Sequence, residues 1–92
     1  MKLELELYIG GKKKTFVAPF VSARMLRRAM EIAKEEEKMD QVESMDATVD
    51  YLADLFGNQF TRDEFYDGIP AHEFQDTVER CMKSIVSGMN ES

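Results

Sequence analysis

The sequence predicts one α+β domain, residues 1–92, in which an N-terminal β-hairpin packs on three to four short amphipathic helices. The first segment alternates apolar and polar residues with the period of a strand, and the rest of the chain places apolar residues at helical spacing. A chain of 92 residues, 43% of them hydrophobic, holds one compact domain. We expect the hairpin at residues 2–18 and helices at about residues 22–38, 45–56, 62–67 and 70–87.

The first strand carries four apolar residues that alternate with polar ones: Leu3, Leu5, Leu7 and Ile9. This alternation places them on one face. Gly10 and Gly11 follow, and glycine readily adopts the positive φ of tight hairpin turns. A loop of two or four residues places Phe16 and Ala18 on the leucine face, whereas a loop of three places them on the other face. We therefore expect an even loop, of either length.

The first helix is expected between Pro19, which ends the second strand, and a polar segment at residues 34–41. Ser22 is a suitable N-cap for this helix. Its apolar face is formed by residues at helical spacing: Met25, Leu26, Ala29, Met30 and Ala33. Residues 34–41 lose this periodicity, so we expect a frayed helix end and a mobile linker there.

The second helix is expected to begin near Ser44 or Asp46, and Gly57 is suited to its left-handed C-terminal cap. Its apolar stripe consists of Met45, Val49, Leu52 and Phe56. A short third helix should follow, because its first turn has the spacing of a capping box. The residues of that box are Thr61 and Glu64.

The third helix should stop at Gly68, and Pro70 suits the first turn of a final helix. The final helix has a continuous apolar stripe made of Phe74, Val78, Cys81, Met82, Ile85 and Met89. One side of this helix should therefore face the core.

The chain offers no converging set of catalytic residues. His72, the single histidine, falls beside Glu73 and has no second His or Cys in its neighbourhood to complete a triad or a metal site. Cys81, the single cysteine, lies on an apolar stripe, so we expect a buried thiol and no internal disulfide. The acidic stretch at residues 54–67 lacks the ligand spacing of a calcium loop. We therefore expect no enzymatic activity, no metal and no cofactor.

The net charge of −6 is unevenly distributed along the chain. Residues 1–30 carry seven Lys or Arg and two Glu, whereas residues 31–92 carry five Lys or Arg and sixteen Asp or Glu. Six of these basic residues are candidates for self-association: Lys12, Lys13, Lys14, Arg24, Arg27 and Arg28. Contact with the acidic part of another copy would give rings or open spirals. The alternative is a chance distribution of solvated charges. We expect no nucleic-acid partner, because the rest of the surface repels phosphates.

Six methionines follow Met1, and five of them lie on the predicted apolar stripes. Flexible thioether side chains fill irregular cores, and they also line grooves that accept partner helices of varied sequence. If part of a stripe is uncovered, we expect a partner site on the last helix, aided by the first. The candidate partner-binding residues are Met25, Met30, Phe74, Val78, Met82, Ile85 and Met89.

Two segments carry a family resemblance. The first runs from Lys14 to Ala29 and reads KTFVAPFVSARMLRRA. The second runs from Val49 to Phe74 and contains LFGNQFT and FYDGI. With the hairpin added, the similarity covers nearly the whole chain, and its motifs are specific in combination. The chain thus resembles the tail assembly chaperones of long-tailed phages and prophages of Gram-positive bacteria.

The resemblance implies a non-enzymatic protein of the host bacterial cytoplasm that coats the tape measure protein in many copies before the tail tube polymerises. Such a chaperone then leaves and is absent from the finished virion. In these phages a ribosomal frameshift often makes a longer product whose extra domain recruits the tail tube protein. The competing functions are a small DNA-associated regulator that uses the basic hairpin and first helix, and a structural virion subunit.

A membrane partner is not expected. No apolar run approaches the roughly 18 to 20 residues needed to cross a bilayer. The N-terminal segment also lacks the unbroken apolar region of a signal peptide, because its leucines alternate with glutamates.

Overall fold

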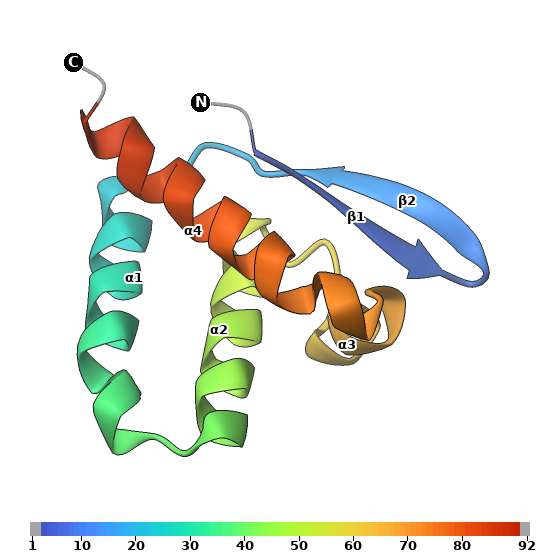
Figure 1. Cartoon of the computed structure of the whole chain (residues 1–92). Helices are drawn as coiled ribbons and strands as arrows, with labels where there is room; N and C mark the ends of the chain where they lie inside the picture. The colour runs from blue at the N-terminus through green and yellow to red at the C-terminus, as the bar shows by residue number, and fades with distance from the viewer. Residues whose placement is uncertain (1–2, 91–92) are drawn as a thin grey trace.

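A β-hairpin lies beside a set of helices, and the C-terminal helix crosses the others (Figure 1). The computed structural model describes residues 3–90, and their side chains up to residue 85. The predicted α+β class, a hairpin followed by short helices, is confirmed. In chain order the elements are β1 (Glu4–Ile9), β2 (Lys12–Val17), α1 (Ala23–Glu35), the 3₁₀ turn η1 (Glu36–Lys38), α2 (Gln41–Leu55), α3 (Arg62–Gly68), the 3₁₀ turn η2 (Ala71–Glu73) and α4 (Phe74–Asn90).

The hairpin has a two-residue turn. Gly10 and Gly11 form it with φ angles of 62° and 76°, and β1 pairs antiparallel with β2 so that Leu5 lies opposite Phe16. The expectation of an even loop is therefore confirmed, and the shorter loop is the one present. Leu5 and Leu7 on the inner face of β1, and Leu3 immediately before the strand, are at most 2% exposed. This face supplies one wall of the core.

α1 and α2 lie side by side and are joined by η1 at the end far from the hairpin (Figure 1). A capping box starts α2 at Gln41: the Glu43 backbone N–H donates to the Asp40 carboxylate at 2.8 Å, and the Asp40 N–H donates to the Glu43 carboxylate at 3.3 Å. The predicted start near Ser44 or Asp46 is therefore wrong. The prediction followed the spacing of apolar residues, and the capping residues Asp40 and Glu43 are polar, so this spacing could not locate them. The expected linker instead holds the end of α1, η1 and this cap.

The predicted capping box of α3 is confirmed, with Glu64 N–H donating to the Thr61 hydroxyl at 3.1 Å and Thr61 N–H donating to the Glu64 carboxylate at 2.8 Å. Gly57 adopts φ 69° after α2, as a left-handed cap requires. Ser22 occupies the N-cap of α1, but its side chain makes no capping hydrogen bond. Pro70 precedes η2, so that α4 proper begins four residues after the predicted start.

The core lies between the inner face of the hairpin and α2, α3 and α4. Its ring cluster is centred on Phe60, whose centroid lies 5.3 to 5.9 Å from those of Phe16, Phe56 and Phe65. β1 contacts α3 closely at Gly68, where a Cβ atom would lie 2.8 Å from the Tyr8 carbonyl oxygen. Glycine is therefore required at this position by backbone approach, in addition to ending α3 as predicted. The remaining buried apolar residues are Ala29, Val49, Tyr51, Leu52, Ala53, Leu55, Cys81 and Ile85.

A candidate partner-binding groove

A groove of about 560 Å³ lies between the N-terminal part of α2 and the N-terminal part of α4. A smaller space of about 70 Å³ between α1, α2 and α4 shares Glu36, Thr48 and Val78 with it. The two spaces are therefore adjacent, and we refer to them together as the helical groove. Its larger apolar lining residues are Ile32, Met39, Met45, Phe74, Val78 and Met82.

The apolar lining of the helical groove is half-buried: each of these side chains packs partly against the protein and keeps an accessible part. The wall formed by Phe74 is held by ring contacts, stacked on Tyr66 at 6.2 Å and edge-on to Phe65 at 6.0 Å. The Thr48 hydroxyl donates to the Ser44 carbonyl at 2.9 Å, so this polar group of the groove is satisfied within its own helix. The groove thus offers apolar side chains, interspersed with polar groups, on a fixed scaffold.

Three predicted partner-binding residues line the groove together: Phe74, Val78 and Met82. Met30 is 61% exposed on α1 and is not among the lining residues, whereas Ile85 is only 4% exposed and belongs to the core. The other candidates are Met25, which is half-buried against the core, and Met89, whose side chain lies outside the described residues. A partner-binding role for these residues stays a prediction.

Sequence reasoning missed three of the larger apolar lining residues: Ile32, Met39 and Met45. Met39 fell in the expected linker, and Met45 was assigned to a core stripe, yet both side chains are half-buried in the groove. The clue available in the sequence was the Asp40 and Glu43 spacing, which matches a capping box and moves the start of α2 toward Met39.

The rim of the groove at the α1–α2 turn is acidic. Residues 35–43 hold five carboxylates and a single lysine, Lys38. Glu36 and Asp40 line the groove itself. The pKa of Asp40 lies below its usual range, mainly because the Glu43 backbone N–H donates to the carboxylate. Asp40 is therefore ionised at neutral pH.

A family comparison matches the whole chain. Residues 1–92 fit the model of a family described as phage tail chaperone protein. The chain belongs to this phage tail chaperone family. The family resemblance predicted from the sequence is thus confirmed. No curated protein and no solved structure matches the chain.

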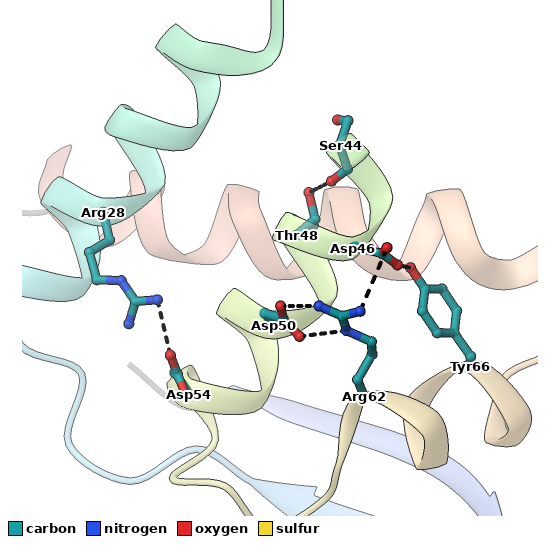
Figure 2. A network of polar contacts seen from close by, with 8 residues as sticks. All are labelled: Arg28, Ser44, Asp46, Thr48, Asp50, Asp54, Arg62 and Tyr66. Atoms are coloured by element: carbon teal, nitrogen blue, oxygen red, sulfur yellow. Dashed lines mark hydrogen bonds and ion pairs between the residues drawn. The ribbon is translucent and has the colours of Figure 1, made fainter. Parts of the chain in front are cut away.

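A polar network in this tail chaperone fixes α3 against α2 and thereby supports the groove. Figure 2 shows Arg62 reaching two carboxylates of α2, with Nε 2.8 Å from Asp50 and a terminal nitrogen 3.6 Å from Asp46. The Tyr66 hydroxyl donates to Asp46 at 2.7 Å, and burial together with this bond raises the pKa of Tyr66 to about 12. Because the Tyr66 ring stacks on Phe74, the network holds one wall of the groove in place.

A second pair joins α1 to α2. Arg28 lies 3.0 Å from the Asp54 carboxylate (Figure 2), and its guanidinium stands 5.5 Å from the centre of the Tyr51 ring. The Tyr51 hydroxyl donates to the Met25 carbonyl at 2.6 Å, which also ties α2 to α1. These contacts set the spacing of the two helices whose facing sides line the smaller part of the groove.

The structure separates the predicted basic residues into two groups. The hairpin group is Lys12, Lys13 and Lys14, and the α1 group is Arg24, Arg27 and Arg28. Lys13 pairs with Glu6 at 2.7 Å, Arg27 with Glu31 at 3.7 Å, and Arg28 with Asp54. Within residues 3–85, Lys12, Lys14 and Arg24 make no ion pair. Their proposed part in self-association is untested.

Of the two residues considered for catalysis, Cys81 is buried as predicted, and His72 lies in η2 and not in the final helix. Cys81 is fully buried, and burial raises the pKa of its thiol. The His72 side chain is 83% exposed and lies 3.6 Å from Glu73. Within the described part of the chain, no group of three or more His, Cys, Asp or Glu side chains could hold a metal ion. Among the same residues, no helix has the length and apolar character needed to span a membrane.

Proposed function

We propose that this tail chaperone binds helical segments of the tape measure protein in the helical groove and coats that protein before the tail tube polymerises. The observation that carries the proposal is the groove itself, in which three methionines and other apolar side chains lie beside polar groups, within a member of the phage tail chaperone family. A partner helix can project its apolar side chains into such a groove. Methionine adapts to varied partner sequences, as a long helical protein would present along its length.

On this proposal the protein acts in the host bacterial cytoplasm, without catalysis, in many copies, and it leaves before the virion is complete. Self-association through the basic residues would let neighbouring copies follow one tape measure protein. A longer frameshifted product would carry the tail tube protein to the same complex. The family assignment supports a role in tail assembly, and the steps above are our specific proposal for that role.

The test is co-purification of co-expressed tape measure protein with groove variants. Val78→Asp places a charge in the shared part of the groove, where the side chain is half-buried, and it should abolish co-purification while the helix content by circular dichroism is retained. Phe20→Asp is the matched control, because Phe20 is 90% exposed in the loop before α1 and is not a groove residue. The control should retain the partner.

Three results would contradict the proposal. A folded Val78→Asp variant that retains the tape measure protein would exclude the groove as the binding site. Salt-sensitive binding to duplex DNA would favour a regulator that uses the basic hairpin and α1. Persistence of the protein in finished tails would favour a structural virion subunit.

A further inference from the structure

Charge is concentrated at one end of the helical groove. The α1–α2 turn and the helix ends beside it contribute five carboxylates within nine residues, namely Glu35, Glu36, Glu37, Asp40 and Glu43. Two of them, Glu36 and Asp40, line the groove beside Met39 and Met45. The opposite wall adds Gln75, which donates to the Glu79 carboxylate at 3.1 Å. The carboxylates that line the groove therefore lie at its α1–α2 end, and the α4 side contributes an uncharged amide.

These rim carboxylates keep their charge available to an external partner. Within residues 3–85, none of the five forms an ion pair with a basic side chain. Glu36 accepts a hydrogen bond from the neutral Ser44 hydroxyl at 3.4 Å, whereas Asp40 and Glu43 accept from backbone N–H groups of their own helix cap. Hydrogen bonds to neutral groups leave the negative charge of each carboxylate uncompensated.

We infer that the occupant of the helical groove is a basic amphipathic helix of another protein, with an apolar stripe flanked by Lys or Arg. This inference rests on the proposed function of the groove. The apolar stripe would pack on Met45, Phe74 and Val78, while the flanking cations reach the rim carboxylates. A helix with acidic flanks would meet like charges at the same rim.

A second copy of this chain does not fit the same description. Its own basic amphipathic helix is α1, whose apolar face is in use. Ala29 on that face is 4% exposed, and Met25, Leu26 and Ile32 pack against the core. Docking this face into another copy would require α1 to leave its own domain. The charge pattern therefore favours a different protein as the occupant.

The test uses two labelled synthetic peptides of about 18 residues, roughly 27 Å long as helices, with the same leucine stripe and either lysine or glutamate flanks. Fluorescence anisotropy gives their dissociation constants at low and high salt. We expect the lysine peptide to bind about tenfold more tightly at low salt, as two or three exposed charge pairs provide. High salt should reduce this preference, because exposed charges are screened.

A pair of double variants separates the rim from the overall charge. Glu36→Lys/Glu37→Lys reverses two rim charges, and Asp63→Lys/Asp67→Lys makes the same change in net charge on exposed positions of α3. The rim variant should lose most of the preference for the lysine peptide, whereas the α3 variant should keep it. Circular dichroism on both variants checks that the fold is retained.

The outcomes distinguish the two proposals. Equal affinity for the two peptides, an equal loss of preference in both double variants, or no binding of either peptide would overturn the inference about charge. The proposed function is judged separately, by whether Val78→Asp releases the co-expressed tape measure protein. If Val78→Asp releases the tape measure protein but the parent protein binds both peptides equally, the proposed function stands. Only the basic character of the occupant is then refuted.

Discussion

Replacing Gly68 by alanine tests how closely the hairpin lies against α3. The added Cβ would be 2.8 Å from the Tyr8 carbonyl oxygen, 3.1 Å from the Leu7 Cβ and 3.2 Å from the Tyr8 backbone nitrogen. Two of these three atoms belong to the backbone of β1, so a change of side-chain rotamer cannot relieve the contact. The strand and the helix would have to move apart.

The expected loss of stability follows from two opposing effects. Overpacking at a well-packed site costs about 1–3 kcal/mol. The higher helix propensity of alanine returns at most about 1 kcal/mol, and less at the last residue of a helix. We therefore expect Gly68→Ala to lower the free energy of unfolding by about 1–2 kcal/mol. For a domain of this length, that corresponds to a fall in Tm of about 4–15 °C.

Thermal unfolding followed by circular dichroism, with urea unfolding as a second measurement, checks this expectation. Asp67→Ala is the control, because Asp67 is the exposed neighbour in the same helix, and we expect it to change stability by no more than about 0.5 kcal/mol. A Gly68→Ala protein as stable as the parent would show that β1 and α3 are not in close contact at this position. The reasoning about the hairpin's place in the core would then fail.

Two further predictions concern ionisation and association. Burial and the hydrogen bond to Asp46 raise the pKa of Tyr66 from the ordinary value of about 10 to about 12, so its contribution to stability should be complete below pH 10 and lost as the pH rises through 12. Urea unfolding across this pH range should show a weaker decline in Tyr66→Phe than in the parent, and identical declines would exclude Tyr66 as the cause. The protein should also self-associate reversibly and less strongly at high salt. Sedimentation velocity should show this association and its loss in Lys12→Glu/Lys14→Glu, whereas a monomer at every concentration and salt would contradict it.

Local chemistry in the sequence determined much of the fold. The alternation of Leu3, Leu5 and Leu7 identified the inner face of the hairpin, because side chains of a strand point to alternate sides. The turn at Gly10 and Gly11 could be expected because positive φ angles favour glycine. Each of these features depends on residues close together in the chain. The start of α2 was missed even though its capping box is equally local.

The helical groove was decided by the tertiary structure. Periodicity placed Val78, Met82 and Ile85 on one stripe of the last helix, but it could not tell which of them other helices would cover. Ile85 is enclosed in the core, whereas Val78 and Met82 border the space left between α1, α2 and α4. That difference depends on where helices distant in sequence cross one another. A single helix specifies the direction of its apolar side, and only the packing of several helices determines how much of that side remains accessible.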